Sequence, residues 1–418
     1  MKIIRKIKAG AIQYVLVMSV IVIIVLFAFI SLVFLQQKVR LKSEVYKETI
    51  QSSYLAFDYL NQAEIPYDEL TEFKFTEHKN EKTYITRKHW GAYDLGIVQS
   101  TIKNETSQKV ALLGNKNSKR EALYLQENNQ SLVLVGNAKI VGDVILPKRG
   151  VKTGNIAGVS YYGNELVYGT IGYNAGKLPE IHTIEYLKQF VQGVFFDDMK
   201  SFDIQEGMLL KQAFTEEILL FETPVNLDLQ NLSLQGNLVV VSATKIRVHS
   251  SANLQNVILM APEVIVESGV KGSFQIFATQ KVLIKNKAEL LYPSSIVLLD
   301  NSEQEKPTYE EARIQIQELA HIRGSVVYCA QKKASNYKTQ VFVESGAKIT
   351  GEVYCNLNLD LRGKVDGFVY TNNFITKEAG GIYLNHIYNG QIDAKNISEH
   401  YSGLLIGNIT LKVARWIE

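Results

Sequence analysis

The hydrophobic pattern begins with an almost unbroken apolar stretch near the N-terminus. Between Tyr14 and Leu35 the only side chains with a polar group are those of Tyr14, Ser19 and Ser31. The hydrocarbon core of a bilayer needs roughly 20 such residues, whereas a cleaved secretory signal has an apolar core of only ~7–15. We therefore predict a transmembrane helix here, with membrane lipid around it.

The same helix is predicted to continue past the apolar stretch. Between Gly10 and Pro66 the chain has neither glycine nor proline, the residues that interrupt helices most strongly. One helix over residues 11–62 would be roughly 75 Å long, half of it in lipid. Its outer half carries apolar residues at helical spacing, which we expect to pack on another part of the structure: Tyr46, Ile50, Tyr54, Phe57 and Leu60.

Basic residues flank the apolar stretch on both sides in nearly equal numbers. They are Lys2, Arg5, Lys6 and Lys8 before it, and Lys38, Arg40 and Lys42 after it. Such residues orient a membrane helix, but here the two sides almost balance. The very short N-terminal tail favours a cytoplasmic N-terminus. We expect a single-pass inner-membrane protein with a periplasmic or cell-surface C-terminal domain.

Downstream, short apolar strands repeat at a fixed interval. The segments Lys245–Val248, Glu263–Val266 and Lys281–Ile284 follow one another every eighteen residues. A second short strand precedes each of them, and such paired strands are typical of a solenoid whose turns stack. The alternation predicts six inward side chains in stacked ladders: Ile246, Val248, Val264, Val266, Val282 and Ile284.

A second motif repeats as well. Residues 138–144 (AKIVGDV) recur as 320–326, as 347–353 and, more loosely, as 363–369. Each copy has a glycine between inward apolar positions, where it can permit a bend or a close approach of backbone. The pattern resembles bactofilins and other parallel β-helix proteins over about residues 131–150 and 236–372. An ordinary β-sandwich is the alternative.

The expected fold class is therefore mainly β. A long N-terminal transmembrane helix would precede a right-handed parallel β-helix, with a small α/β cap. The expected boundaries are a basic leader at 1–10, the helix at 11–62, a small α/β region at 63–130, the β-helix at 131–372 and a C-terminal cap at 373–418. Insertions are expected at about 179–222, which includes a short helix at 183–194, and at 301–319 and 331–339.

Composition and charge narrow the classes of function. The net charge of +3 is close to balanced, which argues against a dedicated nucleic-acid binder. Two cysteines, Cys329 and Cys355, are too few for a disulfide framework or a cysteine zinc site. They fall on opposite faces of their strands by register, which predicts two free thiols with Cys355 inside.

The sequence contains no recognisable catalytic, metal or cofactor motif. The seven histidines form neither an H-x-H nor an H-E-x-x-H pattern, and there is no G-x-S-x-G or G-x-G-x-x-G. The one conspicuous carboxylate pair is Asp197-Asp198, and adjacent residues on a strand point to opposite faces. We expect no catalytic residues, no metal and no cofactor, and hence no enzyme.

The N-terminus resembles those of type IV pilins and type II secretion pseudopilins. The resemblance covers residues 1–62: a basic leader, Lys8-Ala9-Gly10 before Ala11-Ile12, and an apolar helix with an amphipathic continuation. It implies that a prepilin peptidase cuts after Gly10, leaving Ala11 first. Major subunits carry a glutamate at the fifth mature position, which here is Val15. Certain minor subunits of pili and pseudopili also lack it, so the resemblance implies a minor subunit.

These observations favour a non-enzymatic structural subunit of a surface filament or envelope assembly. Its partners would be lipid and other pilin-like subunits or further copies of itself. Two alternatives remain: an anchored β-helix enzyme or lectin acting on cell-surface polysaccharide, and a bactofilin-like scaffold that polymerises end to end.

Overall fold

The computed structural model describes residues 9–62, 65–74, 81–116, 120–173, 176–196, 199–301, 313–331 and 337–417. The chain divides into two compact units. One comprises Met1–Leu60, Glu69–Thr86 and Val98–Lys109, and the other comprises Asn61–Asp68, Arg87–Ile97 and Val110–Glu418. Most of the predicted basic leader lies outside the described residues.

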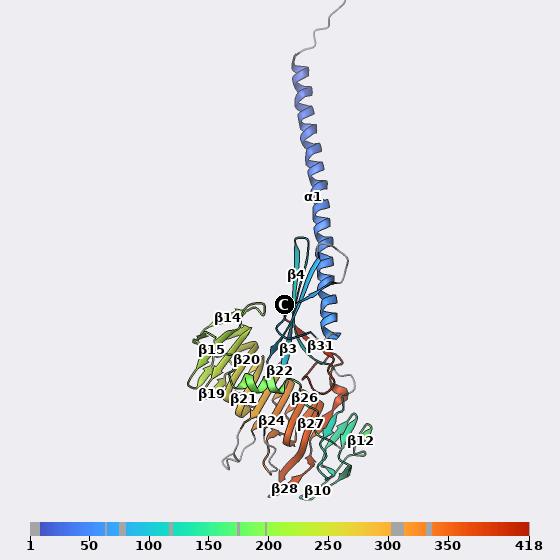
Figure 1. Cartoon of the computed structure of the whole chain (residues 1–418), viewed down its shortest axis with the longest axis vertical. Helices are drawn as coiled ribbons and strands as arrows, with labels where there is room; N and C mark the ends of the chain where they lie inside the picture. Colours follow the sequence, from blue (N-terminus) through green and yellow to red (C-terminus); the bar gives the residue numbers. More distant parts are fainter. Residues whose placement is uncertain are drawn as a thin grey trace, which may run out of the picture. The chain divides into compact units, whose positions relative to one another are not determined.

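The N-terminal helix is continuous. Helix α1 (Ala9–Gln62) has 54 residues and passes from the apolar stretch into the outer half without a break (Figure 1). The prediction of one uninterrupted helix is confirmed. It follows from the absence of glycine and proline after Gly10, because no residue in this stretch removes a backbone hydrogen bond.

An antiparallel sheet follows α1 in the chain. Its order is β1 (Thr71–Phe73), β2 (Glu81–Trp90), β3 (Tyr93–Ile102), β4 (Glu105–Asn115) and β31 (Leu411–Trp416). The unit that contains α1 takes β1 and residues 81–86, 98–102 and 105–109 of these strands. The predicted α/β region at 63–130 has strands but no helix among its described residues. Inner and outer positions alternate along β2, as expected for a strand with one buried face.

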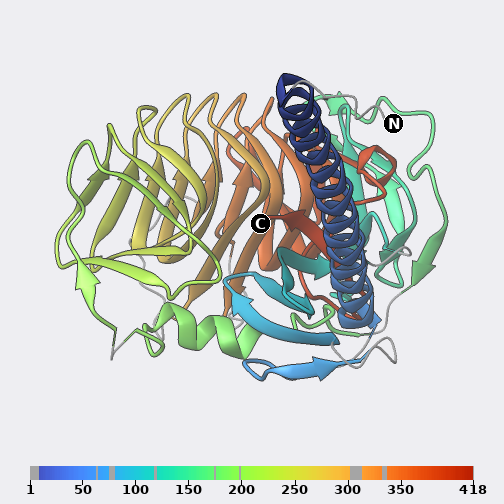
Figure 2. The same cartoon turned by 90° about the horizontal axis from the view of Figure 1, so that it is seen from above.

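The larger unit is built on a closed sheet of parallel strands. Between passes that follow one another in the chain, the parallel pairings have offsets from 15 residues, for Asn358 and Asn373, to 32, for Glu289 and His321. Figure 2 shows these passes side by side, from green through yellow to orange. The mainly β fold class is thus confirmed.

The strands of the closed sheet are short or long. Short strands of successive passes pair to form a line of strands, and a long strand belongs to two or three such lines along its length. The strands are β5 (Leu123–Leu125), β7 (Lys139–Val141), β8 (Val144–Leu146), β12 (Ile171–Tyr173), β13 (Ser201–Phe202), β14 (Leu209–Gln212), β15 (Leu219–Thr223), β16 (Leu227–Leu229), β17 (Ser233–Gly236), β18 (Leu238–Ser242), β19 (Lys245–Val248), β20 (Asn253–Val266), β21 (Lys271–Ile284), β22 (Glu289–Asp300), β23 (Ile314–Ile316), β24 (His321–Ala330), β25 (Val341–Val343), β26 (Lys348–Leu361), β27 (Lys364–Glu378), β28 (Gly381–Leu384) and β30 (Gln391–Asp393).

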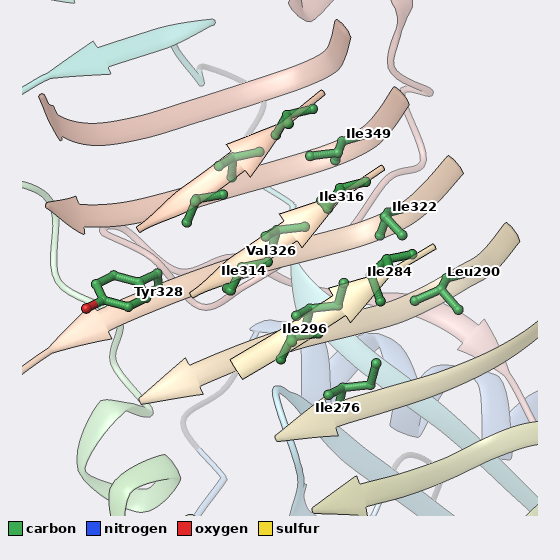
Figure 3. Packing of buried hydrophobic residues seen from close by; sticks show 14 of the residues in the cluster. Ile276, Ile284, Leu290, Ile296, Ile314, Ile316, Ile322, Val326, Tyr328 and Ile349 are labelled. Atoms are coloured by element: carbon green, nitrogen blue, oxygen red, sulfur yellow. The ribbon is translucent and has the colours of Figure 1, made fainter. Parts of the chain in front are cut away.

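Apolar side chains fill the interior of this sheet. Ile246, Val264, Val282 and Ile314 occupy one register position on successive passes, and all four are fully buried. Figure 3 shows Ile284 and Ile316 of this line of strands with inward side chains of other lines, such as Leu290 and Ile322. One continuous apolar core results.

The repeated glycines let neighbouring passes approach closely. Gly324, Gly351 and Gly367 pair in one register row, and their φ angles are 146°, 145° and 148°. A Cβ atom on Gly351 would overlap the carbonyl oxygen of Gly324, and one on Gly367 would overlap that of Gly351. Positive φ and the missing side chain together explain why glycine recurs in the motif.

The passes do not stack in chain order. β27 pairs with β5, and β30 pairs with β7, so residues 123–173 form the last passes, beyond residues 364–393. Figure 1 accordingly shows teal β12 close to orange β27 and red β28. The first passes, at the other end, are β13 and β14. The 138–144 copy of the motif therefore stacks after the other copies instead of before them.

Two smaller elements lie beside these last passes. A three-stranded sheet has the order β29 (His386–Tyr388), β6 (Leu132–Val135) and β9 (Val151–Thr153), and a hairpin is formed by β10 (Asn155–Ile156) and β11 (Val159–Ser160). Residues 373–418 were expected to form a cap. Instead, β28 and β30 join the closed sheet, a 3₁₀ turn follows at Ala394–Asn396, and β31 pairs with β4.

Two of the predicted insertions are smaller than expected. Within 179–222, β13, β14 and most of β15 belong to the closed sheet, and within 301–319, β23 does. The reason is visible in β23, where Ile314 and Ile316 supply two fully buried inward positions. Residues 302–312 and 332–336 lie outside the described residues.

The outer face of one line of strands is also buried. Helix α2 (Ile184–Val191), the second-unit parts of β2–β4 and residues 404–406 cover it. Phe190 of α2 packs edge-on against Phe277 of β21, with ring centroids 5.0 Å apart. Strands buried on both faces are continuously apolar, which accounts for runs such as Leu238–Val241.

Candidate functional site

The apolar part of α1 is the most conspicuous surface of the unit that contains it. From Ile12 to Leu35 the large apolar side chains are all exposed, including Val15 at 66%. The most apolar window of α1 has no buried residue and is long and apolar enough to cross a membrane. Even Ser19 keeps its hydroxyl within the helix, donating to the Leu16 carbonyl oxygen at 2.8 Å.

The two residues of the predicted processing site lie within α1. Gly10 and Ala11 are helical and exposed, and no described residue outside this turn of the helix lies within 4 Å of where a Cβ on Gly10 would be. The basic residues of the leader lie outside the described residues. Tyr14 is exposed on the same helix, at the start of the apolar stretch.

The outer half of α1 buries a different face from the one the sequence predicts. Phe57 and Leu60 of the predicted stripe are buried and Ile50 is half-buried, but Tyr46 and Tyr54 are each 48% exposed. Small residues form the buried face: Thr49, Ser52, Ser53 and Ala56. These residues recur every three or four positions, which indicates one face of a helix. The prediction followed the tyrosines instead and missed this pattern.

Hydroxyl groups line this buried face. Ser52 donates a 2.5 Å hydrogen bond to the carboxylate of Glu81 on β2. Thr83 and Ser100, both fully buried, bond to each other at 3.1 Å on β2 and β3. Tyr54, although exposed, has the ammonium of Lys109 4.1 Å from its ring centre. Small side chains allow the backbones of helix and sheet to come close, and the other two helix hydroxyls donate to backbone carbonyl oxygens one turn earlier, Thr49 to Val45 and Ser53 to Thr49.

The structure brings the six predicted ladder residues together inside the closed sheet. Ile246, Val264 and Val282 form one register row. Val248, Val266 and Ile284 form the next inward row, and all six are fully buried. They serve the core and have no access to a ligand.

A cavity of about 410 Å³ lies beside α2 in the larger unit. Its lining comes from the end of α2, the turn after it and the outer face of β15, β18, β20 and the neighbouring pass. Sequence analysis did not identify it, because its residues are scattered over some ninety positions. Asp197 and Asp198 lie outside the described residues.

Buried charge in the larger unit is paired. The Asp94 carboxylate, which is fully buried, accepts from Arg87 Nη2 at 2.6 Å, from the Tyr67 hydroxyl at 2.9 Å and from His89 Nδ1 at 3.2 Å. The His89 ring is stacked between Tyr67 and Tyr186, at 3.7 and 4.0 Å between centroids. Arg120 forms a buried ion pair with Glu352. These groups hold β2, β3 and α2 in place.

The two cysteines are free and face opposite ways, as predicted. Cys355 is fully buried in the interior, where burial raises the pKa of its thiol to about 12. Cys329 is half-buried against the outer apolar cluster. Within the described ranges, no group of three or more His, Cys, Asp or Glu residues could hold a metal ion.

The two ends of the closed sheet carry strand edges and opposite charge. Among the described strands, β13, β14 and β16 pair on one side only; so does β12 at the other end, and so does β9 in the three-stranded sheet beside it. Residues 203–228 hold six acidic side chains and one lysine, whereas residues 139–152 hold four basic side chains and one aspartate. Apolar side chains are exposed at both ends, with Leu209 at 82% and Tyr173 at 64%.

No protein-family model matches the chain. No curated protein matches it either. Among solved structures it is similar to the competence-associated pilin ComZ from Thermus thermophilus, with 10% identity over 90% of this chain and 96% of that chain, and a TM-score of 0.23. At this TM-score two chains need not share a fold, so the function proposed below stands on the residues of this chain.

Proposed function

We propose that the chain is a membrane-anchored structural subunit of minor pilin or pseudopilin type. One observation carries the proposal: a single 54-residue helix that is apolar on all sides in its first half and buries a small-residue face in its second. A helix that is apolar all round needs lipid or other apolar helices around it. It would insert with its N-terminus in the cytoplasm and later pack against helices of other subunits.

The role of the larger unit in this proposal is to display a rigid body outside the cytoplasm. We propose that its closed parallel sheet is a right-handed β-helix. The parallel pairings at short offsets, such as 18 residues between Lys245 and Glu263, support this. Stacked passes bury one continuous core, and such bodies are stiff along their length.

Leader processing tests the pilin proposal directly. The full chain is expressed with and without a prepilin peptidase, and its N-terminus is sequenced. The expected result is Ala11 as first residue with the peptidase and Met1 without it. Gly10→Ala should abolish cleavage, while Ala9→Ser, one residue further from the cut on the same side, should leave it intact. An intact Met1 in the presence of an active peptidase, verified on a known prepilin, would overturn the proposal.

The open strand edges favour a second candidate function, a scaffold in which copies stack end to end. Each end of the sheet offers unpaired backbone groups, exposed apolar side chains and a charge opposite to that of the other end. Such edges are templates for further pairing. The acidic end of one copy would then meet the basic end of the next.

Charge exchange tests this stacking. Sedimentation of the full chain in detergent should show oligomers that Lys148→Glu with Arg149→Glu dissociates, and that Glu216→Lys with Glu217→Lys dissociates equally. Mixing the two variants should restore pairs, because each then offers the end that the other lacks. Oligomers that persist in both variants, or fail to form in the mixture, would contradict it.

A further inference from the structure

The cavity beside α2 has a roof and a floor of different origin. Val191, Gly193, Phe196 and Met199 form the roof, at the end of α2 and the turn after it. The floor consists of outward side chains on successive passes of the closed sheet. At about 410 Å³ the volume of the cavity is in the range of small-molecule sites.

The floor is graded from charged to apolar. Glu222 of β15 pairs in register with Val241 of β18, which pairs with Met260 of β20, which pairs with Phe277 of β21. These four side chains therefore form one row across adjacent strands, each about 4.8 Å from the next. The row begins with an exposed carboxylate and ends under Phe190 of α2.

The polar side chains of the lining differ in whether they already form hydrogen bonds within the protein. The Ser242 hydroxyl donates to the Val225 carbonyl oxygen and accepts from two backbone amides, so it belongs to the turn. Glu222, Gln192 and Thr279 have no side-chain partner among the described residues. Among the described residues of the lining, Glu222 is the one charged group, and they include no lysine or arginine.

We propose that this cavity binds a small organic monocation with an apolar body. The cation would pair with Glu222, and the body would lie along Val241 and Met260 beneath Phe196 and Met199. The length of the row, about 10 Å from Glu222 to Met260, suits a body of one ring and a short chain. The acidic stretch 203–228 raises the local concentration of cations and disfavours anions.

Three probes with one apolar body test the proposal: 2-phenylethylammonium, 2-phenylethanol and 3-phenylpropanoate. Each is titrated by saturation-transfer NMR against the full chain in lipid nanodiscs, with empty nanodiscs as the blank. The ammonium should bind, the alcohol about 5-fold more weakly, and the carboxylate not measurably. The 5-fold ratio corresponds to a partly solvated ion pair. Equal binding of all three, or no binding of the ammonium, would overturn the proposal.

Two variants locate the site. Glu222→Gln should reduce the ammonium to the affinity of the alcohol, whereas Glu217→Gln, in the same acidic stretch but outside the lining, should change nothing. Val241→Phe should fill the cavity and abolish binding of ammonium and alcohol together. Near-UV circular dichroism checks that this variant is folded. Unchanged ammonium binding in folded Val241→Phe would place the probe elsewhere and refute the assignment.

Discussion

At the scale of single residues, three glycines of the repeated motif are positions of the closed sheet where a side chain has no room. Gly324, Gly351 and Gly367 each combine a positive φ with a backbone oxygen where a Cβ would lie. Gly236 of β17 shares both constraints, whereas some other glycines have only the first. Gly269 has a φ of 75°, and nothing lies within 4 Å of its missing Cβ. Comparing Gly351 with Gly269 therefore separates the free-energy cost of a positive φ from the cost of a steric clash with the neighbouring backbone.

Gly351→Ala is therefore expected to destabilise the protein far more than Gly269→Ala. The first must distort the neighbouring pass as well as strain its own backbone, at a cost of about 3 kcal/mol or more. The second carries only the conformational cost, about 1–2 kcal/mol. Chemical denaturation followed by far-UV circular dichroism measures both. Equal losses would mean that the passes can separate freely at Gly351.

A buried carboxylate gives the stability a defined pH dependence. Burial raises the pKa of Asp360 to about 6, against the opposing effect of the Arg362 guanidinium 3.2 Å away. A raised pKa means that the folded state holds the proton more tightly than the unfolded state. Protonation of Asp360 therefore stabilises the folded state. This stabilisation is complete below the pKa of the unfolded state, near 3.8, and is lost as the pH rises through about 6.

Asp360→Asn removes this titration and keeps an acceptor for Arg362. Between pH 4 and pH 7 the wild type should lose stability relative to the variant, on the order of 1–3 kcal/mol. Denaturation of both proteins at four pH values measures the difference. A gap that stays constant with pH would show that Asp360 is charged throughout.

At the scale of elements, the C-terminal segment depends on one buried amide. Asn115, at the end of β4, donates through Nδ2 to the carbonyl oxygens of Ile406 and Asn408, at 2.9 and 3.2 Å. Its Oδ1 accepts from the Thr410 amide at 2.9 Å. Three hydrogen bonds from one fully buried side chain thus fix the segment that leads into β31.

Asn115→Ala should release this segment while the rest of the larger unit stays folded. Each buried group left without a partner costs about 1–3 kcal/mol. Hydrogen exchange should quicken at residues 403–416 and stay slow in β20 and β21. Asn253→Ala, an exposed amide on β20, is the control. Unchanged protection at 403–416 would mean that the apolar contacts of Leu404 and Ile406 suffice to hold it.

At the scale of the whole molecule, the sheet is completed by segments far apart in the chain. β6 and β7 need β29 and β30 as neighbours, and β5 needs β27. In stacked architectures each pass is stabilised mainly by the adjacent ones. The passes at 123–173 therefore depend on residues more than two hundred positions later.

Truncation after Asn385 removes β29 and β30 and should free the early passes. Hydrogen exchange at residues 123–173 is expected to become fast, while β20–β22 remain protected because their own neighbours are intact. Truncation after Asn408, which removes only β31, should leave residues 123–173 protected. If residues 123–173 stay protected after truncation at Asn385, pairing with β27 alone is enough to hold these passes.

Much of this architecture could be predicted from local pattern, and the rest could not. The continuity of α1, the inward ladder from Ile246 to Ile284 and the free thiols follow from periodicity and breakers alone. The order of the passes does not, because the 138–144 motif looks the same wherever it stacks. The prediction of the buried face of α1 was wrong because Tyr46 and Tyr54 are large and apolar, whereas the small hydroxyl residues that are buried there add little to a hydrophobic pattern. The cavity beside α2 joins positions that no local pattern connects.

The placement of residues 123–173 has a consequence for biosynthesis. Ribosomes add about 5–20 residues per second, so roughly 220 further residues keep these strands waiting about 10–40 s for β30. During that time their apolar side chains, such as Leu134 and Ile140, have no permanent partner. Export and chaperone binding have this interval in which to act. A premature stop before β30 would leave residues 123–173, the part of the sheet that is synthesised first, without their neighbouring strands. The passes β20–β22 would still be able to fold.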